Sequence, residues 1–273
     1  MKNKIYMRTE SPISILAQRL KKLKNSLTNS RSLMKDEISD LNSIINMMEN
    51  LEKYVDACTS SESPHLSKLN QLTMQTDWDK VFSDQKSETR LMTQMMSSKV
   101  SGQLLKMLVS ISKAKTVLEL GLFSGYSALA MAEGLPEDGK LISCEIDPYS
   151  VDFARKYLDS TPLGHKIQTR LGSALNLLDD LASEGEVFDF VFIDARKTEY
   201  QRYVNKLLSN NLVTKNSILC IDNVFMKGAC FSEDEKQTKG SIEVKKLNTQ
   251  LSSEKFFTVM LPLRDGMTIA KLR

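Results

Sequence analysis

The chain has 273 residues, 41% hydrophobic and 26% charged, so it can bury one sizeable core and is neither disordered nor collagen-like. Lys and Arg number 37 against 34 Asp and Glu, and a net charge of +3 lacks the cationic field of a dedicated nucleic-acid binder. Apolar runs such as 188–193 fall far short of the roughly 20 residues that span a bilayer. Residues 1–10 mix basic and polar side chains and no apolar stretch follows them, so we expect no signal peptide and a cytoplasmic protein.

The first third of the chain is predicted to be helical. All 11 glycines fall at Gly102 or later. Apolar residues step by three and four along 13–27 and again along 34–55, which predicts two amphipathic helices, the second ending near Cys58. Their basic faces are typical of a solvated surface, with a membrane or an acidic partner as the alternative. We expect residues 1–94 to be a helical extension that packs on the core or forms a homodimer.

From residue 95 the pattern alternates between helices and short strands. We expect helices at 103–112, 126–132, 151–158, 174–181, 199–209 and 241–251, and strands at 116–120, 140–146, 166–171, 188–193, 217–222, 256–262 and 267–272. Helical crossovers of this length indicate an α/β fold with a doubly wound, mainly parallel seven-stranded sheet. The segment 263–266 is too short for a crossover, and it contains Asp265-Gly266, so the last two strands form an antiparallel hairpin at the end of the sheet.

Ligands of such sheets lie beyond the carboxyl ends of the strands, so the residues after each strand matter most. The first strand leads into Glu119-Leu-Gly121-Leu-Phe-Ser-Gly125-Tyr-Ser127, where two glycines allow a tight turn and Ser127 is expected to cap the next helix. The G-x-G-x-x-G spacing of a dinucleotide fold is missing. Glu119 would repel a phosphate, and it is suited to a cation or an amino group.

The second and third strands end in residues suited to a nucleoside. Glu145 can accept hydrogen bonds from both hydroxyls of a ribose, whereas Asp147 before Pro148 fits a helix cap. The small residues Gly172-Ser-Ala174 leave room for a flat adenine ring, although ordinary loop chemistry explains them equally well.

Acidic residues end the fourth and fifth predicted strands. Asp194, Asp222 and the Asn223 carbonyl oxygen would offer three hard oxygen ligands on one rim, which suits Mg²⁺, while the lack of a nearby His disfavours zinc. Acids that merely cap helices are the alternative. Lys197, three residues after Asp194, would face the same site and could act as a base beside a metal.

Other candidates carry less weight. His65 and His165 are expected in surface loops, and Met92, Met95 and Met96 in the core. Trp78 with Phe82 is expected to pack the extension onto the core, with a role in covering the substrate as the alternative. The cysteines, Cys58, Cys144, Cys220 and Cys230, include no C-x-x-C pair, and two lie in predicted strands, which favours free buried thiols.

Taken together, four of these motifs resemble the metal-dependent class I O-methyltransferases that include catechol and caffeoyl-CoA O-methyltransferases. They are 119–127, 192–197, 221–223 and 261–268. The resemblance covers about residues 95–273, the expected methyltransferase domain. It implies that S-adenosylmethionine is bound by Glu119, Gly121, Ser127, Glu145, Ala174 and Asp194, and that Mg²⁺, or Mn²⁺ or Ca²⁺, is bound by Asp194, Asp222 and Asn223. Lys197 and Asp194 would be catalytic.

The N-terminal third narrows the resemblance. The stretches 58–64, 77–78 and 102–107 resemble the O-methyltransferases of mycosporine-like amino-acid biosynthesis, a subgroup with a long N-terminal extension. This resemblance implies methylation of demethyl-4-deoxygadusol, a cyclohexenone with neighbouring oxygens, to 4-deoxygadusol. Arg196, where plant-type members usually have an acid, and 225–227, where they often have a tryptophan, weaken the expectation of a CoA ester. The alternatives are a catechol or caffeoyl-CoA type enzyme and a non-catalytic S-adenosylmethionine-binding or assembly protein.

Overall fold

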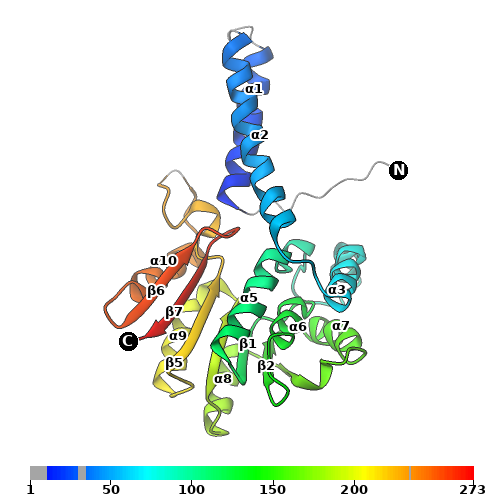
Figure 1. Cartoon of the computed structure of the whole chain (residues 1–273), viewed down its shortest axis with the longest axis vertical. Helices are drawn as coiled ribbons and strands as arrows, with labels where there is room; N and C mark the ends of the chain where they lie inside the picture. The colour runs from blue at the N-terminus through cyan, green and yellow to red at the C-terminus, as the bar shows by residue number, and fades with distance from the viewer. Residues whose placement is uncertain (1–10, 30–34, 234) are drawn as a thin grey trace.

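A seven-stranded sheet forms the centre of the molecule (Figure 1). The computed structural model describes residues 11–29, 35–233 and 235–273. The strand order is β3-β2-β1-β4-β5-β7-β6; β1 to β5 run parallel, and β7 is antiparallel to both of its neighbours. The predicted fold class is therefore confirmed, including the hairpin at the end of the sheet. The strands are β1 Thr116–Leu120, β2 Lys140–Glu145, β3 Ile167–Leu171, β4 Phe188–Ile193, β5 Val213–Asp222, β6 Phe256–Leu261 and β7 Met267–Leu272.

Helices cover both faces of the sheet, because apolar side chains point alternately to either side of each strand. Val117 and Phe190 pack in one core with α5 Lys99–Ser112, α6 Tyr126–Ala132 and α7 Pro148–Leu158. Leu118 and Val191 pack in the other core with α8 Ala174–Ser183, α9 Tyr200–Ser209 and α10 Lys239–Leu251. The two cores fix the carboxyl ends of the parallel strands at one edge of the sheet.

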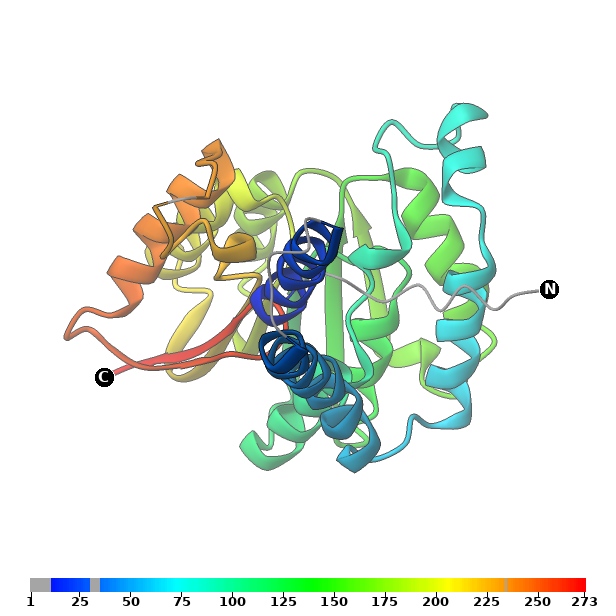
Figure 2. The same ribbon diagram turned by 90° about the horizontal axis from the view of Figure 1, so that it is seen from above.

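The two N-terminal helices, α1 Pro12–Asn29 and α2 Lys35–Cys58, form a hairpin that projects from the core (Figures 1 and 2). Both match the predicted helices; Met34, counted in the second, lies outside the described residues. Ala17 and Ile45 are buried along the seam. At its base Arg19 pairs with Glu235 at 2.6 Å. Among the described residues, no helix has the length and apolarity needed to cross a membrane.

Two helices that the sequence did not predict follow the hairpin, α3 Pro64–Gln75 and α4 Trp78–Ser83. Ser63 caps α3 by accepting the Leu66 N–H, and Asp77 caps α4 by accepting the Lys80 N–H. His65 therefore lies on a helix and not in the expected loop, although it is exposed as predicted. His165 is exposed as predicted as well.

Trp78 packs α4 against the core built on the sheet, as predicted. Its ring centroid lies 4.9 Å from that of Phe123 and 5.1 Å from that of Phe153, and its Nε1 donates to the Thr73 carbonyl at 2.9 Å. Phe82 remains exposed and takes no part in this cluster. The aromatic contacts bring the chain after α4 over the edge of the sheet where the strands end.

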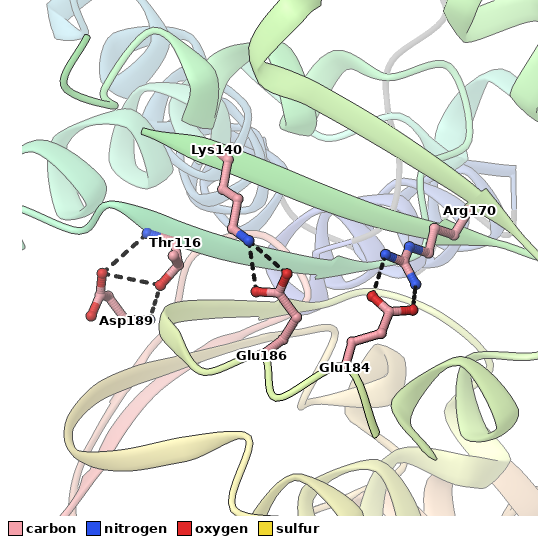
Figure 3. A network of polar contacts seen from close by, with 6 residues as sticks. All are labelled: Thr116, Lys140, Arg170, Glu184, Glu186 and Asp189. Carbon is pink, nitrogen blue, oxygen red and sulfur yellow. Dashed lines mark hydrogen bonds and ion pairs between the residues drawn. The ribbon is translucent and has the colours of Figure 1, made fainter. Parts of the chain in front are cut away.

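Polar pairs connect strands to one another and to neighbouring loops (Figure 3). The Asp189 carboxylate accepts both the N–H and the hydroxyl of Thr116, Lys140 Nζ donates to Glu186 at 2.6 Å, and Arg170 forms a two-pronged pair with Glu184. Exposed pairs of this kind contribute little stability each. Cys144 and Cys220 are free and buried, as predicted.

Candidate active site

A cavity of about 540 Å³ opens at the carboxyl ends of β1, β2, β4 and β5. The cavity is bounded by the β1–α6 turn, the ends of β2, β4 and β5, the β6–β7 turn and the chain from residue 89 to residue 101. The predicted site residues that line it are Gly121, Ser127, Glu145, Ala174, Asp194, Lys197, Asp222 and Asn223. Glu119 alone among the predicted set is not on the lining.

The β1–α6 turn needs its glycines for different reasons. Gly121 has φ +102, and a Cβ there would collide with the backbone oxygen of Asp194, so the turn and the end of β4 touch through a glycine. Gly125, with φ +85, is the N-cap of α6. The expectation that Ser127 caps this helix is therefore wrong: Ser127 lies in its first turn and its hydroxyl donates to Glu119 Oε1 at 2.6 Å.

Glu119 lies behind the cavity wall. Its side chain is fully buried and accepts hydrogen bonds from Ser127 and Ser143. Burial raises the pKa of the Glu119 carboxyl to about 8, although both hydroxyl hydrogen bonds act in the opposite direction. A carboxyl in this position holds Ser127 against the cavity and does not itself face a ligand.

Glu145 at the end of β2 is fixed by backbone groups. Oε2 accepts the N–H groups of Leu122 and Phe123 at 3.1 and 2.9 Å, and Oε1 accepts those of Ile146 and Asp147 at 2.7 and 3.0 Å. The carboxylate thus joins the β1–α6 turn to the end of β2, and its position in the cavity wall is set before any ligand binds.

Asp147 is engaged elsewhere, as the helix-cap prediction required. Oδ1 accepts the Ser150 N–H at the start of α7, and Oδ2 accepts the hydroxyl of buried Ser87. Glu145 is therefore the better placed of the two acids for a ligand. Beyond it Gly172, with φ +148, and Ala174 form a wall with little side-chain volume.

Asp194, Lys197, Asp222 and Asn223 form an acidic corner at the other end of the cavity. Lys197 Nζ lies 2.5 Å from Asp194 Oδ1 and 2.8 Å from the hydroxyl of Tyr200, whose pKa burial raises well above its usual value. Asp222 Oδ1 accepts the Asn223 N–H at 2.7 Å. Burial, and next the neighbouring Asp194 carboxylate, raise the pKa of Asp222 to about 7.

The acidic corner offers two carboxylates and one amide as oxygen donors. Among the described residues no group of three His, Cys, Asp or Glu side chains is arranged to hold a metal. A cation at this corner would therefore need the Asn223 amide, or oxygens of a bound molecule, beside Asp194 and Asp222. Burial and next the Asp194 carboxylate raise the pKa of Asp222, and a bound divalent cation would act against both.

Residues 87–98, the cap segment, complete the cavity and were not predicted. Met92 and Met95 are 43% and 39% exposed and line the cavity, so the expectation that they fill the core is wrong for both; Met96 is buried but also reaches the lining. Sequence reasoning treated them as packing because methionine is a common core residue, whereas an apolar cavity wall uses the same side chain. Arg264 in the β6–β7 turn was also missed.

Comparisons with known proteins show which family the chain resembles over most of its length. A family model described as O-methyltransferase matches residues 57–273. Caffeoyl-CoA O-methyltransferase 2 of Zea mays is 34% identical over 186 residues, which are 65% of this chain and 70% of that protein. Tricin synthase 1 of Oryza sativa subsp. japonica is 34% identical over 189 residues, 65% of this chain and 74% of that protein. The solved O-methyltransferase TomG from Streptomyces achromogenes, in complex with SAM, has a TM-score of 0.68 and 26% identity and covers 82% of this chain and 96% of its own.

Proposed function

The chain belongs to the O-methyltransferase family, and on this premise we propose that it transfers the methyl group of S-adenosylmethionine to a hydroxyl of a small acceptor with neighbouring oxygens. The observation that carries the proposal is that one cavity joins the fixed Glu145 carboxylate to the acidic corner. The Glu145 carboxylate suits a ribose, and the acidic corner suits an acceptor hydroxyl that must lose a proton.

The cofactor would be bound along the ends of β1, β2 and β4. Glu145 would accept its ribose hydroxyls, Gly121 would let it approach the backbone, and Ala174 would leave space for its adenine. Ser127 and Asp194 would complete this wall, with Glu119 positioning Ser127 from behind. When bound, S-adenosylmethionine supplies an electrophilic methyl group on a sulfonium sulfur.

Asp194, Asp222 and Asn223 would hold a divalent cation, with Mg²⁺, Mn²⁺ or Ca²⁺ all compatible with hard oxygen donors. Such a cation lowers the pKa of a hydroxyl group that it coordinates. The fit rests on the oxygen donors of Asp194, Asp222 and Asn223, which line the same end of the cavity.

Lys197 would accept the acceptor's proton. Its Nζ is held by Asp194 and by the Tyr200 hydroxyl, so it points into the cavity from a fixed place. With the amine neutral, the hydroxyl proton would move to Nζ while the oxygen took the methyl group from sulfur, which would leave a methyl ether and a thioether. A cation bound to Asp194 would favour the neutral amine, because it would engage the carboxylate that now pairs with the ammonium. The apolar cap segment would exclude water from this reaction.

We propose demethyl-4-deoxygadusol as the acceptor, because its neighbouring oxygens suit a metal-bound chelate and the chain resembles enzymes of that subgroup. A catechol is the second candidate, with the same chelating pair. Arg196 and Lys227, which depart from the plant pattern, both line the cavity and support an acceptor other than a CoA ester.

The test is transfer of a labelled methyl group to catechol and to the cyclohexenone with Mg²⁺ present and again in excess EDTA. We expect labelled methyl ether only with the cation, and none with Asp222→Ala. Asp152→Ala, which removes an exposed carboxylate outside the cavity, is the matched control and should behave as the wild type. Transfer that is equally fast in EDTA would refute the metal site, and binding of cofactor without transfer to either acceptor would refute the acceptor class.

We further propose that the chain forms a homodimer through its α1–α2 hairpin. The outer side of α2 carries exposed side chains at the alternating spacing of three and four that pairs helices, namely Ile44, Met47, Leu51, Tyr54 and Cys58. The positions beside this seam, Ser43, Met48, Asn50, Val55 and Ala57, bear no charge. A second copy fits because a charge-free surface is complementary to itself across a two-fold axis.

A further inference from the structure

The turn that joins β6 to β7 places an arginine where the backbone favours glycine. The turn is Leu263–Gly266, closed by the Gly266 N–H donating to the Leu263 carbonyl at 2.9 Å. Arg264, its first central residue, has φ +52, while Asp265 does not share the positive φ. A hairpin turn with positive φ at the first central residue alone usually has glycine there, because a Cβ is disfavoured in this region.

The local backbone gives no reason for this arginine, but its surroundings do. Arg264 is half-buried and lines the cavity on the side of the acidic corner. Within the described part of the chain its guanidinium has neither an ion pair nor a hydrogen bond. Arg264 and Asp222 line the same cavity, and the positive charge of Arg264 acts weakly to lower the pKa of Asp222.

The other charges of this corner are already engaged. Lys197 is paired with Asp194, and the Asp265 carboxylate accepts the Lys227 backbone N–H at 2.6 Å. Arg264 therefore adds a cation that forms no ion pair with a carboxylate in the described part of the chain, although its charge acts on Asp222 from a distance. Strain kept at a cavity wall by a side chain with no local partner is typical of a group that serves a ligand.

We propose that Arg264 binds a planar anionic group of the acceptor, in which two oxygens share one negative charge. A guanidinium offers two parallel N–H donors, which match the two oxygens of a carboxylate. It would also attract the anion of a β-hydroxy enone, which shares one negative charge between two oxygens that lie farther apart. The proposal rests on the proposed methyltransferase function and adds to it the charge of the substrate.

The probe is 3,4-dihydroxybenzoate, compared with 3,4-dihydroxybenzamide, which keeps the diol and the shape but not the charge. Binding of each to the protein is measured by calorimetry with S-adenosylhomocysteine present, and kcat/KM by methyl transfer. We expect the wild type to prefer the carboxylate by about 10- to 100-fold, the range for a hydrogen bond between charged groups. Arg264→Gln should abolish the preference, and Arg264→Lys should retain part of it.

Arg264→Gly separates the role of the side chain from that of the backbone. It should raise the melting temperature, because glycine accepts the positive φ, and should still lose the preference for the carboxylate. Lys113→Gly is the matched control: Lys113 also has a positive φ, +56, but lies outside the cavity, so this variant should keep the preference. Competition by cyclohexane-1,3-dione, but not by neutral cyclohexenone, would identify the enone anion as a second source of the same chemistry.

The proposal would be overturned if the wild type bound 3,4-dihydroxybenzoate and 3,4-dihydroxybenzamide equally well. It would also be overturned if Arg264→Gln still preferred the carboxylate. Failure of methyl transfer to every diol would instead refute the proposed function. The calorimetric comparison would still decide the role of Arg264 in that case, since it does not depend on turnover.

Discussion

Replacing Glu119 by glutamine is expected to make the protein more stable at alkaline pH and to leave it unchanged near pH 5. The Glu119 carboxyl is fully buried, and burial raises its pKa from 4.5 to about 8. In the unfolded chain the same carboxyl titrates near its ordinary value. Between these two values the folded protein binds one more proton than the unfolded chain, so the free energy of unfolding falls as pH rises.

The size of the effect follows from the same interval. Stability from the protonated carboxyl is fully present below pH 4.5 and is lost as pH rises through about 8. The difference between the pKa values of the unfolded and folded states corresponds to a contribution on the order of 5 kcal/mol to the free energy of unfolding. Glutamine keeps the shape and, like the protonated carboxyl, can accept from one of the two serine hydroxyls and donate to the other, but it does not titrate. At pH 9 the free energy of unfolding of the variant should therefore exceed that of the wild type by several kcal/mol.

Urea unfolding at pH 5, 7 and 9 would measure this difference. Glu88→Gln changes an exposed carboxylate, and its free energy of unfolding should follow that of the wild type at all three pH values. If the wild type and Glu119→Gln kept a constant difference from pH 5 to pH 9, the buried carboxyl would not be protonated in the folded protein, and the assignment of its pKa would be wrong.

Three further changes test other parts of the molecule. Glu145→Gln should weaken S-adenosylhomocysteine binding about tenfold or more, because it loses a charged acceptor worth roughly 1.5 to 3 kcal/mol per hydrogen bond; an unchanged dissociation constant in calorimetry would remove Glu145 from the ribose site. Lys197→Ala should lower kcat by on the order of 10² to 10⁴ with cofactor affinity retained, and a rate within threefold of the wild type would exclude it as the base. Met47→Glu should convert the dimer to a monomer in analytical ultracentrifugation, whereas Asn46→Glu, on another side of α2, should not; a wild-type monomer, or association only with lipid vesicles, would refute the dimer.

Much of the sheet was predictable because burial on both faces leaves a clear sequence pattern. The predicted bounds of β1, β4 and β7 agree with the structure to the residue, since each is a mainly apolar run followed by a glycine or a charged residue. The acids that follow β4 and β5 were predicted to meet on one rim, and both line the same cavity. Parallel topology alone brings them to that edge, so no side-chain detail was needed.

The segment between the hairpin and α5 was not predictable in the same way. Helices α3 and α4 are short, and they depend on the caps from Ser63 and Asp77 and on the packing of Trp78, which joins residues distant in the chain. The depth of Glu119 was equally hidden, because strand periodicity indicates which way a side chain points but not whether a helix covers it. Ser127 was assigned to a cap for its residue type, but the turn already had Gly125 in that role.

Asp147 connects the part of the site that the sequence revealed to the part that it did not. Its two carboxylate oxygens join the start of α7 to Ser87 at the beginning of the cap segment, and its own N–H donates to Glu145. The apolar wall formed by Met92 and Met95 is therefore attached to the same loop that fixes the proposed ribose acceptor. A residue whose sequence context predicted only a helix cap thus lies where the covering of the cavity and the geometry of its cofactor end depend on one buried carboxylate.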